Sequence, residues 1–170
     1  MTKGECDLER ELLEWFRGAG RVVVVGVGNP IRMDDFVGVK IVWDLKGKVD
    51  SDRVMLIEAE TIPENHMQGI IDYKPTHILI IDAAKMGLRP GETRLIKPEQ
   101  LTAFPAFTTH MLPLRIFCEY LARSKRIKIA LLLIEPKQSD FGEGLTPEVR
   151  FSEQYVVSVL YNTLSWRKGL

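Results

Sequence analysis

The chain has 170 residues, of which 45% are hydrophobic and 27% are charged, and its 23 basic residues balance its 23 acidic residues. A net charge of zero excludes a general attraction to nucleic acid or to anionic membranes, so we expect neither as a partner. The length and the ordinary composition predict one globular domain over residues 1–170.

The sequence also carries an expectation about where the protein is found. Its apolar runs are shorter than a membrane-spanning helix requires, so we expect no direct membrane insertion. The first eighteen residues are acidic, whereas a signal peptide has a basic start and an apolar middle. Cys6 and Cys118 lie far apart, which is typical of reduced thiols, and we expect a soluble, cytoplasmic protein.

Apolar residues recur either at helical spacing or in unbroken β-branched runs, and the two patterns alternate along the chain. In chain order we expect a helix over 7–16, a strand over 21–26, a helix over 35–45, a strand over 53–58, a helix over 62–73, a strand over 77–82, a short edge strand over 92–96, a helix over 111–122, a strand over 127–135 and a helix over 146–166. This alternation predicts an α/β sandwich with a mostly parallel sheet, in which ligands bind beyond the carboxyl ends of the strands.

The first segment whose residues could take part in binding or catalysis is Gly26–Asp35, after the first predicted strand. Its glycines allow a sharp turn, as in a dinucleotide-binding loop. However, Ile31 stands where that loop has its third glycine, and Pro30 lacks an amide that would face a phosphate. The acidic pair Asp34-Asp35 would also repel a phosphate. Helix capping accounts for one of these two aspartates and leaves the other to be explained.

Two further residues stand at the ends of predicted elements. Asp82 closes an apolar strand, where a carboxylate needs a partner, and accepting amide protons from the next loop is its structural alternative. His110 lies between a loop and a predicted helix, whereas we expect surface or capping roles for His66 and His77. Cys118 falls within an amphipathic helix, so we expect it in the core.

Asp35, Asp82 and His110 come from three separate elements that we expect to meet at one edge of the sheet. Two carboxylates and an imidazole form a suitable site for a borderline metal ion, with positions left open for a substrate. Their spacing is not a local metal motif, so this convergence is a hypothesis about the fold.

Several segments between residues 21 and 149 agree, in order, with one known pattern. They are Gly26-Val27-Gly28-Asn29, Asp34-Asp35 with Gly38, Pro63-Glu64-Asn65, Ile80-Ile81-Asp82-Ala83, Met86-Gly87-Leu88-Arg89-Pro90-Gly91-Glu92, Thr108-Thr109-His110-Met111-Leu112-Pro113-Leu114 and Gly144-Leu145-Thr146-Pro147. Together these segments resemble the nickel-iron hydrogenase maturation endopeptidases, and within that family the HycI-like subtype.

Three features depart from the family pattern. Met33 stands where the family often has glycine, so the loop backbone is expected to differ there. Glu58-Ala59-Glu60 stands in place of Asp-Gly-Gly, and Glu60 adds a carboxylate near the expected cleft. Residues 1–20 form a helical extension before the family start.

The resemblance implies a three-layer α/β/α sandwich with a five-stranded sheet. It also implies that Asp35, Asp82 and His110 contact nickel, which the bound substrate supplies and the protein does not hold permanently. The implied partner is the precursor of a hydrogenase large subunit, and the implied activity is removal of its C-terminal peptide.

We expect nickel held by the substrate to position the segment that is cut, with Asp35 or Asp82 as the general base for water. Two alternatives stay open. A non-catalytic chaperone that checks nickel loading of the same large subunit would use the same three residues. A nucleotide-dependent oxidoreductase would instead use the turn over 26–28.

Overall fold

The computed structural model describes residues 3–49, 52–103, 111–123 and 126–165. Its elements, in which η denotes a 3-10 helix, are α1 (Lys3–Trp15), β1 (Val22–Val27), η1 (Met33–Phe36), α2 (Val37–Leu45), β2 (Val54–Glu60), η2 (Pro63–His66), α3 (Met67–Tyr73), β3 (His77–Ala83), β4 (Thr93–Ile96), η3 (Pro98–Ala103), α4 (Met111–Ala122), β5 (Lys128–Ile134) and α5 (Pro147–Leu164). The predicted helices and strands are all present within a few residues of their expected bounds. The helices expected over 35–45 and 62–73 each begin as a 3-10 turn, which is a common form of helix start.

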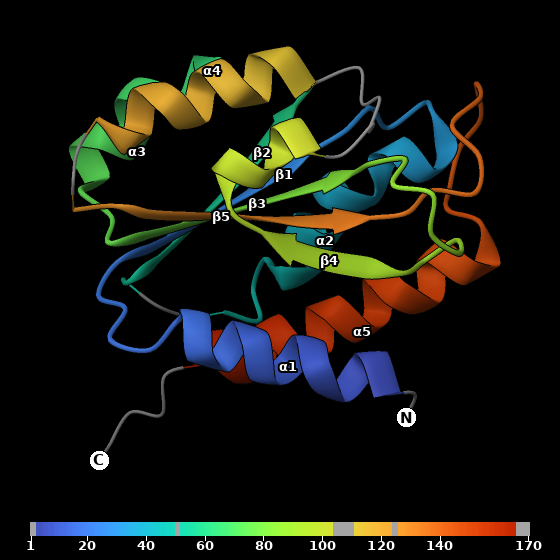
Figure 1. Cartoon of the computed structure of the whole chain (residues 1–170), viewed down its shortest axis with the longest axis horizontal. Coiled ribbons are helices and arrows are strands. Elements are labelled where there is room, and N and C mark those ends of the chain that lie inside the picture. Colours follow the sequence, from blue (N-terminus) through green and yellow to red (C-terminus); the bar gives the residue numbers. More distant parts are fainter. Residues whose placement is uncertain (1–2, 50–51, 104–110, 124–125, 166–170) are drawn as a thin grey trace.

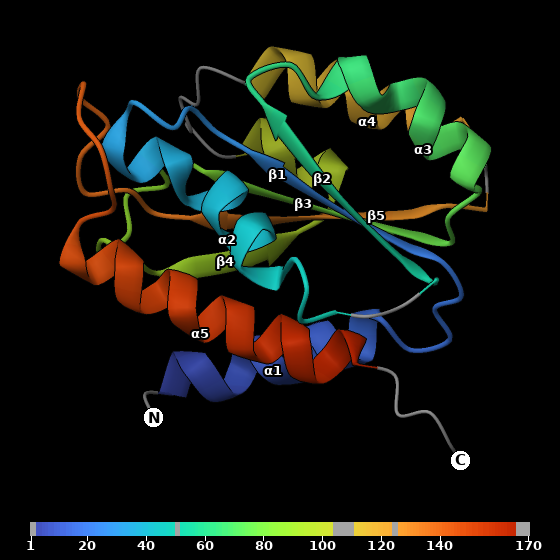
Figure 2. The same ribbon diagram turned by 180° about the vertical axis from the view of Figure 1, so that it is seen from behind.

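The five strands form one sheet in the order β2-β1-β3-β5-β4. Neighbouring strands are parallel except β4, which pairs antiparallel to β5. Its place at the edge of the sheet confirms the predicted short edge strand. Helices α1, α2 and α5 cover one face, and α3 and α4 cover the other (Figure 1, Figure 2). The predicted three-layer α/β/α sandwich is therefore confirmed. Within the described residues, no helix is both long enough and apolar enough to cross a bilayer.

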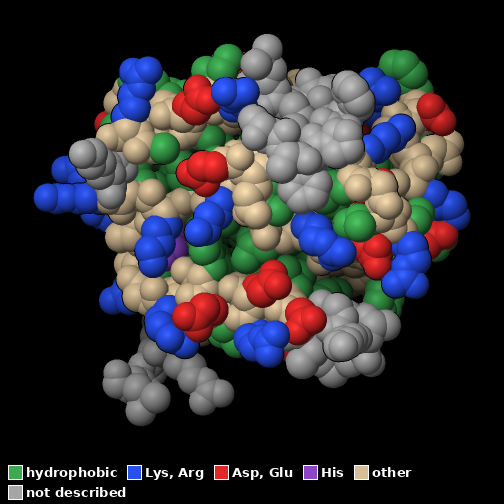
Figure 3. Space-filling model, in the orientation of Figure 1, with side chains coloured by type: hydrophobic (Ala, Val, Ile, Leu, Met, Phe, Trp, Pro, Cys, Tyr) green, Lys and Arg blue, Asp and Glu red, His purple; other side chains and the backbone are tan. Residues whose placement is uncertain are grey.

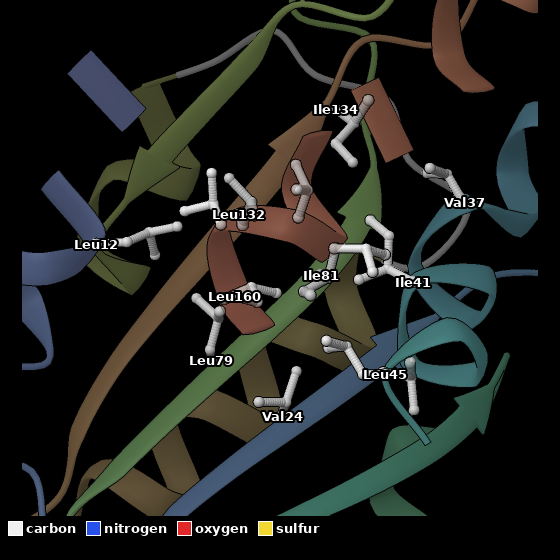
Figure 4. Packing of buried hydrophobic residues seen from close by; sticks show 14 of the residues in the cluster. Leu12, Val24, Val37, Ile41, Leu45, Leu79, Ile81, Leu132, Ile134 and Leu160 are labelled. Atoms are coloured by element: carbon white, nitrogen blue, oxygen red, sulfur yellow. The ribbon is translucent and has the colours of Figure 1, made fainter. Parts of the chain in front are cut away.

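Unbroken apolar strands occur here because the central strands are buried on both faces. Every residue of β1 and β3 is buried, and alternate side chains point to opposite layers. Figure 4 shows one of these layers: Val24 and Leu79 of the sheet lie close to Ile41 and Leu45 of α2 and to Leu160 of α5. The adjacent Val23 and Val25 face the second cluster, under α3 and α4. Burial on both sides removes the alternation that a half-exposed strand would show.

The strand order creates a switch point between β1 and β3. The connection that leaves β1 runs through α2 to β2, on one side of this pair of strands. The connection that leaves β3 runs through β4 and α4 to β5, on the other side. The two crossovers lie on opposite faces, so the chain diverges beyond the carboxyl ends of β1 and β3 (Figure 1, Figure 2). Ligand sites of open α/β sheets form at this kind of divergence.

The expectation of a surface or capping role for His77 is wrong. Its side chain is 2% exposed at the start of β3, in edge-to-face contact with Trp15 at 5.1 Å between ring centroids. Thr76 Oγ1 lies 2.9 Å from Nδ1 of His77. Burial and the nearby Lys128 lower the pKa of His77 below its ordinary value of 6.5. The folded state therefore favours the neutral ring, and the protein loses stability as the pH falls below 6.5. The single-sequence pattern missed this contact because its partner, α1, lies about sixty positions earlier in the chain.

A carboxylate pair, of which one member is buried, joins α2 to α5. Glu153 of α5 is 3% exposed and is hydrogen-bonded to Asp44 of α2. Burial raises the pKa of Glu153 to about 7, and Asp44 adds to the rise. Burial opposes the ionisation of Asp44, but hydrogen bonds with Lys40 and Glu153 lower the pKa of Asp44 below its ordinary value, and Lys40 Nζ donates to Asp44 Oδ2 at 2.5 Å. The pair therefore loses its shared proton as the pH rises through neutrality.

We predict that Glu153→Gln stabilises the protein at alkaline pH. A raised carboxyl pKa means that the folded state binds the proton more tightly, so this contribution is complete below pH 4.5 and is lost as the pH rises through 7. Glutamine can donate to Asp44 without ionising, so the free energy of unfolding should exceed that of the wild type by about 1 to 3 kcal/mol at pH 8.5 and should match it at pH 5. Urea unfolding at both pH values measures this, with exposed Glu143→Gln as the control. Equal stability of variant and wild type at pH 8.5 would contradict the prediction.

Candidate functional site at the switch point

Three glycines let the start of α2 lie directly on the ends of the central strands. A Cβ atom added at Gly38 would collide with the carbonyl oxygens of Ile81 and Val27, and one added at Gly26 would collide with the Gly38 carbonyl. Gly28 has φ of 144°, and its side-chain position is filled by the backbone carbonyl of Asp35. These positions need glycine because two backbones approach more closely than any side chain allows.

This close contact brings two of the predicted site residues to the same edge of the sheet. Asp35 lies in η1, three residues before Gly38, and its Oδ2 accepts the backbone N–H of Asn29 at 2.9 Å. Asp82 is the next residue after Ile81, is fully buried, and its Oδ1 accepts the backbone N–H of Ala83 at 2.9 Å. η1 contacts β3 directly. Both carboxylates therefore lie at the switch point between β1 and β3.

His110, the third predicted residue, lies outside the described residues. Helix α4 begins at the next position and ends shortly before β5 begins, so α4 starts on the side where the parallel strands end (Figure 1). The joint role of Asp35, Asp82 and His110 stays a prediction. In the described part of the chain, which excludes His110, no three His, Cys, Asp or Glu side chains are grouped closely enough to hold a metal ion.

The neighbouring Asp34 has a different environment from Asp35. It is fully buried, and its carboxylate accepts the backbone N–H groups of Lys137 and Gln138, each at 2.9 Å. It also accepts the backbone N–H of Thr146 at 2.7 Å and the hydroxyl of Thr146 at about 3.0 Å. Asp34 is therefore not the aspartate that helix capping would explain, because its partners are in the loop between β5 and α5. Asp34 holds that loop against the loop after β1.

Backbone hydrogen bonds complete the attachment of the two loops. Met33 N–H donates to Gly142 O at 3.0 Å, and Gly142 N–H donates to Ile31 O at 3.0 Å. Asp34 N–H donates to Gln138 O, also at 3.0 Å. Figures 1 and 2 show the two segments side by side at the end of the sheet that carries η1. We call residues 29–35 together with residues 137–146 the rim block.

Glu135 is a second buried carboxylate that the sequence patterns did not single out. It is 7% exposed at the end of β5, and its Oε2 accepts the N–H groups of Met86 at 2.6 Å and Leu88 at 3.2 Å. Its backbone also exchanges hydrogen bonds with Gly91 and Glu92. Glu135 thereby fixes the turn after β3, on the side of Asp82 away from β1.

The two departures from the family pattern keep a glycine-like backbone. Met33 has φ of 41° and Glu60 has φ of 48°, both in the left-handed region that favours glycine. The expectation that the loop backbone at Met33 differs from the family's stays a prediction; in this chain a methionine adopts a conformation that is strained for any residue other than glycine. The Glu60 carbonyl accepts Gly28 N–H at 2.8 Å, which ties the end of β2 to the turn after β1. Glu58 forms an ion pair with Lys46.

Among the described residues, neither Cys118 nor the turn at Gly28 supports a cysteine nucleophile or a nucleotide site. Cys118 is 1% exposed, and burial raises the pKa of its thiol to about 12, so the predicted core role is confirmed. His66 is partly buried at the end of η2. The space beside Gly28 that a pyrophosphate would need is occupied by the Asp35 backbone, which argues against a dinucleotide-binding turn.

A cleft of about 510 Å³ lies elsewhere, between α1 and the end of β4. Its lining includes Trp15, Ile96 and Ala130. Figure 3 shows hydrophobic atoms in a hollow on this face, with acidic side chains below it. Because Ala130 belongs to the amino-terminal half of β5, this cleft lies toward the amino ends of the parallel strands, whereas Asp82 lies toward their carboxyl ends.

We predict that the two adjacent aspartates differ in their effect on stability. Asp34→Asn replaces one accepting oxygen by a donor that faces buried N–H groups, and should lower the free energy of unfolding by about 2 to 4 kcal/mol. Asp35→Asn, the matched control, loses at most one partly buried hydrogen bond and should lower it by less than about 1 kcal/mol. Urea unfolding at pH 7 measures both. Equal losses in the two variants would show that Asp34 does not hold the rim block.

Known proteins of similar sequence and fold agree on one family. The sequence model of the HycI family, described as hydrogenase maturation protease, matches residues 39–162. A putative hydrogenase maturation protease of Methanocaldococcus jannaschii is 34% identical over 90% of this chain and 94% of that protein, and the hydrogenase 3 maturation protease of Escherichia coli K12 is 33% identical over 86% and 90%. The crystal structure of the NiFe hydrogenase maturation protease HycI from Thermococcus kodakarensis KOD1 superposes with a TM-score of 0.82 at 27% identity, covering 91% of this chain and 98% of that one. The chain therefore belongs to the HycI family of hydrogenase maturation proteases.

Proposed function

We propose that this protease removes a C-terminal peptide from the nickel-loaded precursor of a NiFe hydrogenase large subunit. Family membership supports a protease of hydrogenase maturation. The observation that supports the finer proposal is the position of Asp35 and Asp82 at the switch point, on two elements that contact each other, where open α/β sheets bind their ligands. The proposed site of action is the cytoplasm, where the precursor would be assembled.

The donor set suits a metal ion that arrives with ligands of its own. Carboxylate oxygens and one imidazole nitrogen match a borderline divalent cation. Asp35 and Asp82 supply two such donors from the described residues, and His110 is the proposed third. A substrate that carries nickel on its own cysteines would leave these three groups to complete the coordination and to hold the adjacent peptide in place.

The proposed chemistry is hydrolysis of one peptide bond. Asp35 is the better general base because it is only partly buried and accepts one described hydrogen bond, so one oxygen can face a water molecule. It would take a proton from the water as the water oxygen attacks the peptide carbonyl carbon. The same proton then passes to the leaving nitrogen as the C–N bond breaks. Asp82, which is fully buried, would serve to bind and orient the metal.

The test is cleavage of purified large-subunit precursor, prepared with and without nickel, followed by mass spectrometry. We expect the wild type to shorten only the nickel-loaded precursor. Asp35→Asn, Asp82→Asn and His110→Ala should each lower kcat/KM by at least about 100-fold, the lower range for loss of a general base. Asp72→Asn changes an exposed carboxylate on α3 and should leave the rate unchanged.

Thermal unfolding of each variant separates loss of chemistry from loss of fold. A wild-type protein that binds the nickel-loaded precursor without shortening it would favour the chaperone alternative. Cleavage of nickel-free precursor at the same rate would reject nickel dependence while leaving a protease. Full activity of His110→Ala would reject the three-residue assignment.

A further inference from the structure

Two large apolar side chains are exposed on the rim block, next to Asp35. Phe141 is 80% exposed and Ile31 is 54% exposed. The parallel backbone bridge between Arg32 and Gly142 brings the residues before them, Ile31 and Phe141, to the same level. Large apolar side chains that are exposed together are typical of binding surfaces, so this pair indicates a contact with a partner.

The loops that carry this pair are held rigidly. Asp34 accepts four hydrogen-bond donors from the loop between β5 and α5, and the bonds between Ile31, Met33 and Gly142 close the block on its outer side. Asn29 adds two contacts within the first loop, since its Oδ1 accepts Ile31 N–H at 3.1 Å and its carbonyl accepts Arg32 N–H at 3.1 Å. Each exposed side chain is thus attached to a backbone whose position is already fixed before any partner binds.

Arg32 also orients the aromatic ring. Its guanidinium carbon lies 5.6 Å from the centroid of the Phe141 ring, and its Nε donates to the carbonyl of Ser139 at 3.1 Å. The ring is therefore held from one side by a cation and by the loop that carries it. A preordered aromatic side chain loses little conformational entropy when a ligand covers it.

The rim block is continuous with the candidate site. Asp35 N–H donates to Arg32 O at 3.0 Å, and Asp35 Oδ2 accepts from Asn29, so the residues on both sides of Ile31 contact Asp35. A polypeptide bound at Asp35 and Asp82 would extend past this pair on leaving the site. This continuity distinguishes the rim block from the cleft beside β4, which lies at the opposite edge of the sheet.

We infer that Ile31 and Phe141 form the contact that receives an apolar side chain of the precursor close to the peptide bond that is cut. The inference rests on the proposed function, because it takes the occupant of the site to be a polypeptide. The contact adds binding that is equal before and during the reaction, so it sets KM and leaves the chemical step unchanged.

The test is the rate of cleavage of nickel-loaded precursor as a function of precursor concentration. Phe141→Ala should raise KM by about tenfold, the usual effect of removing a central aromatic contact, with kcat within about twofold of the wild type. Ile31→Ala should raise KM less, and Phe141→Leu, which keeps an apolar side chain, should recover most of the loss.

Tyr120→Ala is the matched control. Tyr120 is an exposed aromatic residue, 47% exposed, with Arg123 over its ring at 5.7 Å, but it lies near the end of α4 at the opposite edge of the sheet. It should leave both KM and kcat unchanged, and all variants should keep the wild-type melting temperature. An unchanged KM in Phe141→Ala, with active wild type, overturns the inference and leaves the proposed function standing. No shortening by the wild type overturns both.

Discussion

The site depends on close contact between backbones at the carboxyl ends of β1 and β3. Gly26, Gly28 and Gly38 allow it, because a side chain at any of them would collide with a backbone carbonyl. The contact makes Asp35, at the start of a crossover, a neighbour of Asp82, at the end of a different strand. An alanine at Gly38 would have to push α2 away from the sheet, and Asp35 would move with it. The packing of α2 on the sheet and the proposed chemistry therefore depend on the same three positions.

Two adjacent aspartates divide these tasks. Asp34 is surrounded by N–H and hydroxyl donors, which compensate for its burial and leave no oxygen for a substrate. Asp35 is partly buried and accepts one backbone donor from Asn29. The same contrast applies to Glu135, whose carboxylate is occupied by the turn after β3. Asp34 and Glu135 thus have structural roles, and the less buried Asp35 is the one for which we propose a role in the chemistry.

Some features of the site departed from expectation for identifiable reasons. The sequence could not show which aspartate of the pair is structural, because the donors to Asp34 are 103 to 112 positions away along the chain. The contact of His77 with Trp15 was missed for the same reason. Met33 has a positive φ although methionine disfavours it, and hydrogen bonds between its backbone and the loop over 137–146 hold the chain there.

The amino-acid sequence by itself determined the order of helices and strands, the doubly buried sheet and the family, because burial leaves a local pattern of apolar residues that can be counted along the chain. It also singled out Asp35 and Asp82, as carboxylates that burial patterns alone do not explain. Only the tertiary structure decided which aspartate of the pair is structural, how the two loops of the rim block are joined, and that Phe141 is exposed on the rim block that also carries Asp35. Those features are hydrogen bonds and close contacts between distant segments, and their partners meet only once the chain has crossed the sheet.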